Sequence, residues 1–366
     1  MKIGVLVGND EMVYGSVGVF NNEIINAFKE LGHDVKACCK REDFYDRDFT
    51  IGIGSFGYFF GDTSTFDYLK KPHFAWIIDN PIECNFSYVK SDYLYYITID
   101  MEHQMILEQL GKKSFFLPLG TKKYSGENEN KEYDVVFSGG MESLDGIEKS
   151  WKEYPKAYDA LIKLKDACIE DMSIPPYAKI CNMDIFKNQS FEVRKFLYAQ
   201  INRYLRCYKR KVVLNSIKTH EIHIFGPIRD EQILSKDNII CHGSLSYNDT
   251  YELFAKSKIV LNVTPNFMQG SHDRELVAAE HGAVVFTDEN RYLRDNFKNN
   301  ALMFYDYKRL NWLDKKIDKI LLNDELRIEM VKNSRNIIEQ KFTWTEKCRQ
   351  IIEFAEYALS YTKWFL

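Results

Sequence analysis

The chain has 366 residues, of which 45% are hydrophobic and 14% are aromatic. This length is enough for two domains of ordinary size, and the composition excludes an intrinsically disordered protein. The formal net charge of −4 argues against a protein that coats nucleic acid, because neutralising phosphates requires a basic face. A basic cluster at residues 209–211 is interpreted most simply as a solvated helix end.

No apolar run reaches the roughly 18 residues that a membrane span requires. The apolar run at residues 3–7 is too short for the core of a signal peptide and predicts a first buried strand. The eight cysteines show no metal-ligand spacing and are expected to be reduced thiols. We therefore expect a cytoplasmic protein.

The first 120 residues alternate short apolar runs with helical patterns. Helical patterns occupy residues 20–31 and 101–110, and strand-like runs occupy residues 3–7, 35–38, 49–53, 74–78, 93–99 and 114–117. Apolar strands separated by helices predict a parallel sheet covered on both faces. Residues 1–120 are therefore expected to form a Rossmann-like domain.

A polar segment at residues 121–132 contains a single large apolar residue and predicts a linker. A new strand starts at residue 133, and the alternation of strands and helices resumes and continues to residue 287. The predicted fold class is therefore α/β, with a second Rossmann-like domain at residues 133–344 that faces the first across a cleft.

Two segments depart from the simple alternation. Residues 141–219 show helical periodicity with few strand signals, which predicts a helical insertion in the second domain. This insertion is a candidate contact surface for a homo-oligomer. Residues 345–366 carry an apolar stripe at helical spacing, and we expect a C-terminal helix that returns to the first domain.

The segment at residues 261–288 is the most informative in the chain. A buried strand ends at Val263, a polar loop follows, and Asp273 is the predicted N-cap of the next helix. A helix that starts at the carboxyl end of a parallel strand presents free amides and a positive dipole end to phosphate. Arg274 adds a bidentate cation for a diphosphate, although a surface arginine paired with Asp273 or Glu275 is the simpler alternative.

A glycine-containing turn after the first strand includes Gly15 and Ser16, where a substrate can approach the backbone closely. The turn lacks the spacing of a dinucleotide-binding motif, so nicotinamide binding is not expected. A contact with the acceptor or a diphosphate is one interpretation, and a plain flexible turn is the other.

Several motifs resemble the bacterial group-one glycosyltransferases, and in particular their CgeB-like branch. They are Asn262-Val-Thr-Pro265, Gly270-Ser-His-Asp-Arg274, Ala278-Ala-Glu-His-Gly-Ala-Val-Val-Phe-Thr-Asp288, Phe225-Gly-Pro227, Gly243-Ser-Leu-Ser-Tyr247, Trp76-Ile-Ile-Asp-Asn-Pro81, Leu117-Pro-Leu-Gly120 and Phe342-Thr-Trp344. The resemblance implies a GT-B fold, a nucleoside-diphosphate-sugar donor on the second domain, an acceptor on the first, and no metal in the cleft. It also implies UDP-sugar as the donor and no separate cofactor. The acceptor is expected to be a glycan, a lipid-linked molecule or a protein.

The resemblance also implies a set of site residues. Those expected to contact the donor are Ser138, Gly139, Gly140, Gly226, Thr264, Ser271, His272, Asp273 and Arg274, and those on the acceptor side are Gly15 and Ser16. His242 is a weaker candidate for contact with donor oxygens.

The sequence departs from the retaining relatives at two positions. Those relatives carry paired glutamates where this chain has Gln269 and Val277. A retaining mechanism is therefore not carried over, and an inverting enzyme needs a general base on the acceptor side. Asp79 is the preferred base because it follows an apolar strand at the expected mouth of the cleft; a role in bracing the following turn is the alternative. The other candidates are Asp10, His73 and Asp100.

Three further functions fit the architecture. They are glucosylation of DNA bases, which the net charge disfavours, epimerisation of a nucleotide sugar, and a non-catalytic role in assembly. The sequence contains no grouping with metal-site spacing and no serine-hydrolase motif.

Overall fold

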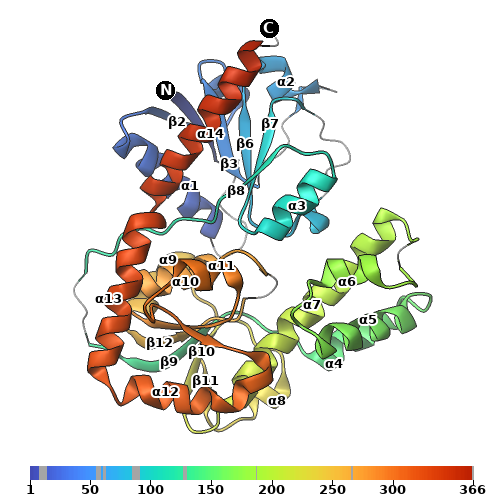
Figure 1. The fold of residues 1–366 in the computed structure, drawn as a ribbon, viewed down its shortest axis with the longest axis vertical. Helices are drawn as coiled ribbons and strands as arrows, with labels where there is room; N and C mark the ends of the chain where they lie inside the picture. Colours follow the sequence, from blue (N-terminus) through green and yellow to red (C-terminus); the bar gives the residue numbers. More distant parts are fainter. Residues whose placement is uncertain are drawn as a thin grey trace.

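Two six-stranded parallel sheets organise the chain into two halves, one above the other in Figure 1. The computed structural model describes residues 1–7, 15–54, 59–60, 63–84, 91–126, 130–186, 188–264 and 267–364. The predicted α/β fold class, with two Rossmann-like domains, is confirmed.

The first domain is built around one of these sheets. Its strands are β1 (Lys2–Leu6), β2 (Asp34–Cys38), β3 (Phe49–Ile53), β6 (His73–Ile77), β7 (Leu94–Thr98) and β8 (Ser114–Phe116), with a separate antiparallel pair β4 (Phe59–Phe60) and β5 (Thr63–Ser64). The order across the sheet is β2-β1-β3-β6-β7-β8. Strands β3, β6 and β7 are buried along their whole length, as expected where helices cover both faces. The helices of this half are α1 (Ser16–Glu30), α2 (Thr65–Leu69) and α3 (Met101–Gln109), with 3₁₀ turns at Arg41–Phe44 and Pro81–Glu83.

The second domain repeats the plan. Its strands are β9 (Tyr133–Ser138), β10 (Ile222–Phe225), β11 (Ile239–Cys241), β12 (Ser257–Leu261), β13 (Val284–Asp288) and β14 (Met303–Tyr305). The order is β11-β10-β9-β12-β13-β14, so the strand order reverses between β9 and β12. In open parallel sheets, ligands bind outside the carboxyl ends of the strands at such a switch point. The topology therefore directs attention to the loops that follow β9 and β12.

The helices of the second half fall into three groups. Those between the strands are α8 (Glu231–Leu234), α9 (Tyr247–Ala255), α10 (Asp273–Glu280) and α11 (Arg291–Asn296). Those after the last strand are α12 (Leu313–Leu321), α13 (Asp324–Lys341) and α14 (Trp344–Trp364), preceded by a 3₁₀ segment at Tyr307–Trp312. Those of the insertion are α4 (Leu144–Trp151), α5 (Tyr158–Glu170), α6 (Pro176–Asn182) and α7 (Phe191–Ser216).

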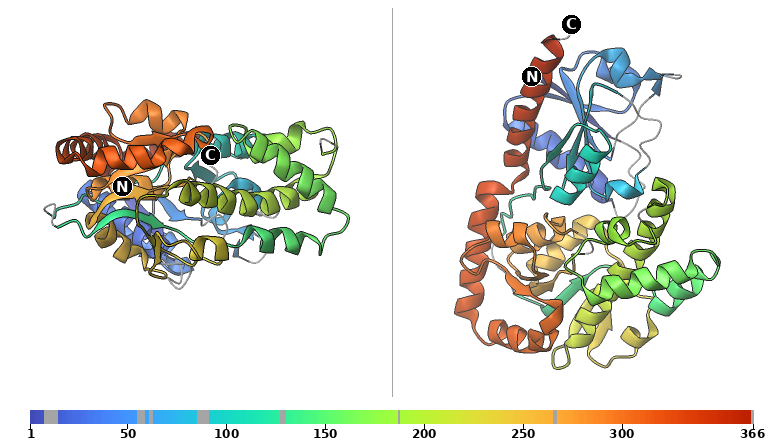
Figure 2. Two further views of the ribbon diagram at one scale, coloured as in Figure 1. Left: turned by 90° about the horizontal axis from the view of Figure 1, so that it is seen from below. Right: turned by 45° about the vertical axis from the view of Figure 1, so that its right-hand side comes forward.

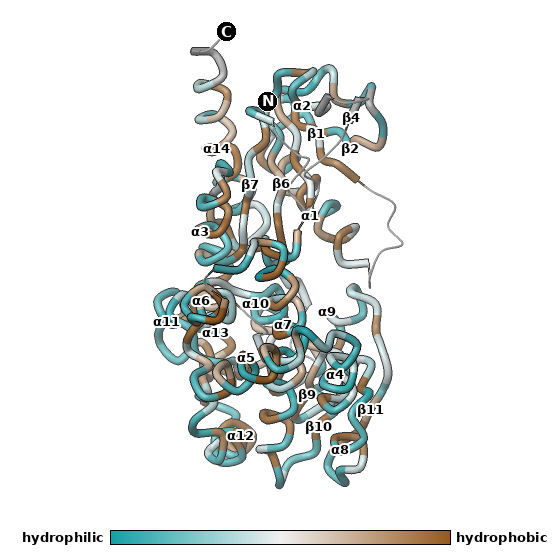
Figure 3. Tube along the Cα trace, turned by 90° about the vertical axis from the view of Figure 1, so that its right-hand side faces the viewer, coloured by the Kyte–Doolittle hydropathy of each residue, from teal (hydrophilic) through white to brown (hydrophobic). Residues whose placement is uncertain are grey.

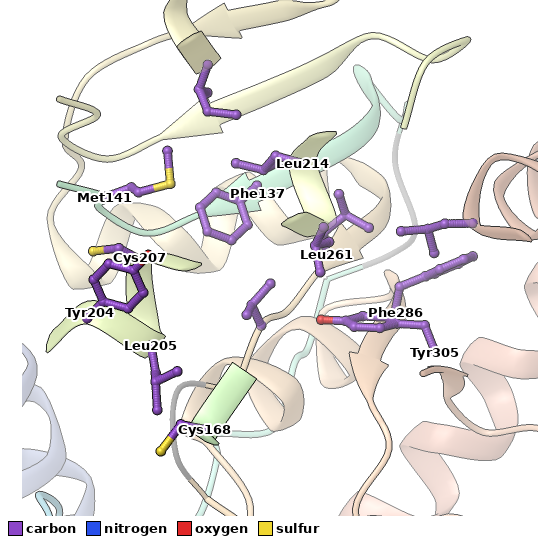
Figure 4. Packing of buried hydrophobic residues seen from close by; sticks show 14 of the residues in the cluster. Phe137, Met141, Cys168, Tyr204, Leu205, Cys207, Leu214, Leu261, Phe286 and Tyr305 are labelled. Atoms are coloured by element: carbon purple, nitrogen blue, oxygen red, sulfur yellow. The ribbon is translucent and has the colours of Figure 1, made fainter. Parts of the chain in front are cut away.

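The insertion projects to one side of the second domain, but its longest helix, α7, runs back into the body of the molecule (Figures 1 and 2). Its C-terminal half packs on the sheet, where Leu205 and Leu214 share one buried cluster with Phe137, Leu261 and Phe286 (Figure 4). A helix that belongs to the core of the domain holds its polar side chains in fixed positions. This anchoring of the predicted insertion in the core of the domain could not be predicted from its helical periodicity alone.

The last helix, α14, runs along the first domain and ends near the N-terminus (Figure 1). Its apolar stripe packs against α1 and the first sheet, with Cys348, Ile351, Ala355 and Ala358 fully buried in the cluster of that domain. The chain therefore crosses between the domains twice. The two crossings lie side by side, since the amide of Thr121 donates to the carbonyl of Phe342 at 2.8 Å.

Deleting residues 345–366 is expected to destabilise the first domain. Removing the buried stripe of α14 exposes its partners in the first domain, which we expect to lower the free energy of unfolding by about 5 kcal/mol. Urea denaturation followed by circular dichroism measures the change. A deletion variant with the midpoint of the full-length protein would show that this packing contributes nothing.

Apolar residues predominate along strands such as β1, whereas apolar and polar residues alternate along the helices (Figure 3). Within the described part of the chain, no helix combines the length and the hydropathy that crossing a membrane requires.

The structure also contains elements that the sequence pattern did not indicate. Strand β14 is only three residues long, so it leaves no periodicity to read. Helix α13 was not predicted either, although Asn323 caps its first turn by accepting from the amide of Leu326 at 2.9 Å.

Candidate functional site

A cavity of about 350 Å³ lies between the two domains at the carboxyl edge of the second sheet. We call it the donor cavity. The first domain contributes the start of α1 and the segment after β6, and the second contributes the turns after β9 and β10 and the N-terminus of α10. The cavity thus lies where the switch in strand order predicts a ligand site. Of the predicted residues, those that line it are Ser16, Asp79, Ser138, Gly139, Gly140, Gly226, His272, Asp273 and Arg274.

Two turns of the second sheet are joined at the cavity wall. The amide of Gly139 donates to the carbonyl of Phe225 at 2.9 Å, and the amide of Met141 donates to the carbonyl of Pro227 at 2.9 Å. A Cβ atom at Gly226 would collide with the carbonyl group of Gly139, so only glycine allows this approach. The turns therefore present backbone, rather than side chains, to the cavity.

The N-terminus of α10 is built differently from the prediction. His272, not Asp273, is the N-cap, since its ring nitrogen accepts from the amide of Arg274 at 3.3 Å. The Glu275 carboxyl group completes a capping box by accepting from the amide of His272 at 3.1 Å. Asp273 is the first helical residue. The sequence suggested it as the cap because aspartate is a common N-cap and histidine is not.

Asp273 is fixed by two neighbours in the cavity wall. Its carboxylate accepts from the hydroxyl of Tyr247 at 2.7 Å and lies 2.5 Å from Nδ1 of His272. Burial disfavours the charge, but His272, Arg274 and Tyr247 outweigh burial and hold the pKa of Asp273 well below its usual value. Asp273 is therefore an anion that orients its neighbours.

Arg274 reaches across the switch point from α10 to β9. Its Nη1 atom donates to the carbonyl of Ser138 at 2.5 Å, and its Nη2 atom lies 3.2 Å from Nε2 of His272. Burial lowers the pKa of Arg274, while Asp273 and Glu275 oppose that shift. The alternative of a surface arginine paired with Asp273 or Glu275 is wrong, because Arg274 lines the donor cavity.

Two further arginines, which are not among the predicted site residues, enter the cavity from α7. Arg206 and Arg210 are one helical turn apart and both line the cavity. Arg210 is buried, and its Nη1 atom donates to the carbonyl of Gly140. The interpretation of residues 209–211 as a solvated helix end is therefore wrong. The four-residue spacing of the two arginines was the available signal, but only the packing of α7 shows which way they face.

The three guanidinium groups leave the cavity with an excess of positive charge. Burial, and then the proximity of Arg274 and Arg206, lowers the pKa of Arg210 to about 9. Within the described residues, no carboxylate lies within ion-pair distance of Arg206 or Arg210. A site with uncompensated arginines and exposed backbone is suited to bind an oligoanion such as a diphosphate.

Two predicted donor contacts lie outside the cavity. Thr264 and Ser271 are buried at 1% and 0% exposure and do not line the cavity. The hydroxyl of Thr264 donates to the carboxyl group of Glu275 at 2.9 Å. That group also accepts from Asn262 at 2.7 Å and from Thr287 at 3.0 Å.

This buried network holds the start of α10 in place. Burial, with Asp288 nearby, raises the pKa of Glu275 to about 8, whereas its hydrogen bonds oppose the shift. Replacing Glu275 with alanine leaves several buried donors without an acceptor, which we expect to cost about 3 kcal/mol of stability. The midpoint of urea denaturation measures this loss, with the exposed Glu153→Ala as control. Equal midpoints for the two variants would contradict it.

Asp79 faces the arginines from the first domain. It lies two residues beyond β6, is exposed, and lines the donor cavity. Its neighbour Asn80 braces the following turn by accepting from the amide of Ile82 at 3.0 Å. Asp79 makes no hydrogen bond or ion pair with another described residue. The bracing role therefore belongs to Asn80, and the carboxylate of Asp79 is available to a substrate.

The other candidate bases have different positions. His73 is buried beside Thr50, with its ring stacked on Phe66, and does not reach the cavity. Asp100 is fully buried and caps α3 by accepting from the amide of Glu102 at 2.7 Å. Asp10 lies outside the described residues.

Asp100 instead links the two domains. Its second carboxylate oxygen accepts from the amide of Gln269 at 2.7 Å, and Met101 donates to the carbonyl of Gln269 at 3.3 Å. Burial raises the pKa of Asp100 to about 6, against these backbone hydrogen bonds. A Cβ atom at Gly270 would collide with the carbonyl of Ile99, so glycine is required for this contact. The link positions the loop that leads to His272.

The remaining candidates lie at the edges of the site. Gly15 is the N-cap of α1 with a φ of 73°, and Ser16 after it lines the cavity while Gly15 does not. His242 is exposed, stacks on Phe225 and lies outside the cavity. Among the described residues, no three His, Cys, Asp or Glu side chains are grouped to hold a metal ion.

Residues 206–353 match the model of a family described as glycosyl transferase-like. The match begins at Arg206 and ends within α14, so it contains Arg210 and the whole of α10. The fold is the GT-B architecture, and the matched part of the chain, residues 206–353, is similar to a glycosyltransferase family. The fold and the match do not distinguish branches, so the resemblance to CgeB-like proteins stays a prediction.

Several solved structures share the fold over nearly the whole chain. BGT of T4 phage with UDP-glucose has a TM-score of 0.55 at 12% identity, covering 97% of this chain and 99% of that one. HepE of Anabaena, with UDP and glucose, has a TM-score of 0.56 at 10% identity, covering 98% and 100%. Sucrose-phosphate synthase of Thermosynechococcus elongatus has a TM-score of 0.55 at 9% identity, covering 98% and 100%. No curated protein matches the sequence.

Proposed function

We propose that this protein transfers a sugar from a uridine-diphosphate sugar to an acceptor hydroxyl, with inversion and without a metal ion. The observation that carries the proposal is the convergence of Arg206, Arg210 and Arg274 on one interdomain cavity, opposite the free carboxylate of Asp79. The similar structures of BGT and HepE contain UDP-glucose, or UDP and glucose, which supports uridine as the base.

The arginines are assigned to the leaving group. A diphosphate leaves with a growing negative charge, and preorganised cations and amides stabilise that charge most where water is excluded. Arg274 and Arg210 are already held by the backbone carbonyls of Ser138 and Gly140, so they need little reorganisation during the reaction. Their positive charge takes the place that a metal ion fills in other transferases.

Asp79 is assigned as the general base. The acceptor oxygen attacks the anomeric carbon, the bond from that carbon to the diphosphate oxygen breaks, and the hydroxyl proton passes to the Asp79 carboxylate. The products are the glycosylated acceptor and UDP. A single displacement of this kind inverts the anomeric configuration.

The proposal is tested with a panel of nucleotide sugars. UDP, GDP and ADP are titrated calorimetrically without added metal, and hydrolysis of each sugar nucleotide is followed by NMR. We expect UDP to bind most tightly, slow release of the inverted sugar from a UDP-sugar, and no effect of EDTA. Preference for GDP or ADP would overturn the assignment of the base, and release of the retained anomer the assignment of mechanism. An isomerised donor would indicate an epimerase.

A further inference from the structure

A second cavity, of about 690 Å³, lies beside the donor cavity and has no role in the steps described above. Five regions enclose it: the end of α5 and the segment after it (169–175), residues 208–209 of α7, residues 267–269, residues 288–291 at the end of β13, and residues 305–308 at the end of β14. Its volume falls within the range of about 300–1,000 Å³ that is typical of small-ligand sites. It also lies at the carboxyl edge of the sheet, where α/β proteins bind ligands.

The two cavities are adjacent, because Phe267 lines both of them. The Phe267 ring lies 5.7 Å from that of His272 in the donor cavity and 5.6 Å from that of His103 on α3. Gln269, two residues further on, also lines the second cavity, and Asp100 of the first domain holds its amide at 2.7 Å. A molecule in the second cavity therefore extends past a fixed aromatic ring to reach the donor cavity.

The two cavities differ in chemistry. The donor cavity is lined by three arginines and a single pair of carboxylates, Asp79 and Asp273. The second cavity has mixed charge, with Lys209, Arg291 and Lys308 against Glu170, Asp288, Glu289 and Asp306. The charges nearly balance, so the second cavity lacks the excess of positive charge that favours a polyanion in the donor cavity.

Both polar hydrogen-bonding groups and aromatic rings line the second cavity. Tyr208 and Tyr307 line it together with the side-chain amide of Gln269. Tyr305 and Asn290 also line it, but their polar groups already bond to Asn262 and Gly270. Aromatic rings provide an apolar face with a polar edge, and carboxylates, amides and ammonium groups provide both donors and acceptors. This is the combination that binds a sugar ring, which is apolar on its C–H faces and carries hydroxyl groups around its rim.

We propose that the second cavity binds the acceptor and that the acceptor is an uncharged oligosaccharide, whose terminal hydroxyl passes Phe267 to reach Asp79. The second domain supplies the lining of this cavity, whereas the resemblance implies an acceptor site on the first domain. The assignment of the acceptor rests on the proposed transferase function. It gives the helical insertion a role in substrate recognition, because the end of α5 and the residues after it form one wall of the cavity.

The test blocks the second cavity without touching the donor cavity. Ser173 is an exposed residue on the wall formed by the insertion, so Ser173→Trp fills space in the cavity with little effect on folding. Ser235→Trp is the matched control, since Ser235 is exposed and lines neither cavity. Arg291→Ala, on the exposed rim, is a second and milder variant. Thermal melts establish that all three variants are folded.

Three quantities are measured: UDP affinity, transfer from UDP-glucose to a panel of mono- to tetrasaccharides, and direct binding of the same saccharides by NMR. We expect Ser173→Trp to raise the acceptor KM at least tenfold and to weaken saccharide binding equally, with UDP affinity unchanged. Arg291→Ala should raise the acceptor KM about threefold, and Ser235→Trp should match the unmodified protein.

The outcomes separate this assignment from the proposed function. UDP-glucose hydrolysis without saccharide binding or transfer, or saccharide transfer that Ser173→Trp leaves unchanged, would overturn the acceptor assignment alone. Glucosylation of a hydroxymethylated DNA duplex in place of saccharides would overturn it in favour of a nucleic-acid acceptor. A third outcome is that Ser173→Trp abolishes saccharide binding while no sugar nucleotide is turned over. This result would support the second cavity as a saccharide site and overturn the transferase function.

Discussion

Replacing Arg274 with alanine is expected to lower kcat/KM for the UDP-sugar by about 10²–10³-fold. Arg274 is held by Ser138 on one side and faces His272 on the other, so its charge is preorganised toward the leaving diphosphate. The main loss should appear in kcat, because the diphosphate gains charge as the glycosidic bond breaks. UDP affinity should fall as well, since the product carries the same diphosphate.

Steady-state kinetics and calorimetric titration of UDP measure the two effects. Arg274→Lys should recover only part of the activity, because an ammonium group cannot reproduce a bidentate contact. Arg349→Ala is the control, since Arg349 is exposed on α14, pairs only with Glu346 on its own helix, and lines neither the donor nor the second cavity. Unchanged UDP affinity and kcat in Arg274→Ala would exclude the arginine from the diphosphate site.

Replacing Asp79 with asparagine is expected to lower kcat by about 10²–10⁴-fold, the contribution typical of a positioned general base. Asparagine keeps the size of the side chain but cannot accept the hydroxyl proton. UDP affinity should stay unchanged because the arginines lie on the other domain. The melting temperature should also be unchanged, because Asp79 is exposed and Asn80 braces the turn.

The comparison of single-turnover transfer rates with UDP affinity tests this assignment. Asp237→Asn, at an exposed position outside both cavities, controls for the loss of one negative charge. A variant at Asp79 that retains the transfer rate would place the base elsewhere. Asp100 is a poor substitute, because its two oxygens are occupied by the amides of Glu102 and Gln269.

Much of the fold follows from local patterns in the sequence. Long apolar strands such as β6 and β7 are buried on both faces, so their composition alone reports a covered parallel sheet. The apolar stripe of α14 can also be predicted from the sequence, since its buried residues recur at helical spacing. Short elements such as β14 cannot be predicted in this way, because three residues do not define a period.

The donor site was predictable where function depends on backbone geometry. The glycines at 139, 140 and 226 and the start of α10 lie after strands, and parallel strands bring such turns to one edge. Thr264 and Ser271 were misplaced for a different reason. A loop residue can point to solvent or to the core, and the buried carboxyl group of Glu275, which accepts from Thr264, lies eleven residues further along the chain.

By itself, the sequence determined two Rossmann-like domains, a returning C-terminal helix and the segment 261–288 that contributes Arg274 to the donor cavity. These depend on periodicity and on order along the chain, which local sequence records. Only the tertiary structure decided that Arg206 and Arg210 join Arg274, and that Asp79 rather than Asp100 is free to face them. The periodicity of a helix identifies its apolar face, but it does not identify what its polar residues meet. That depends on how α7 packs across the sheet, and therefore on contacts between residues far apart in sequence.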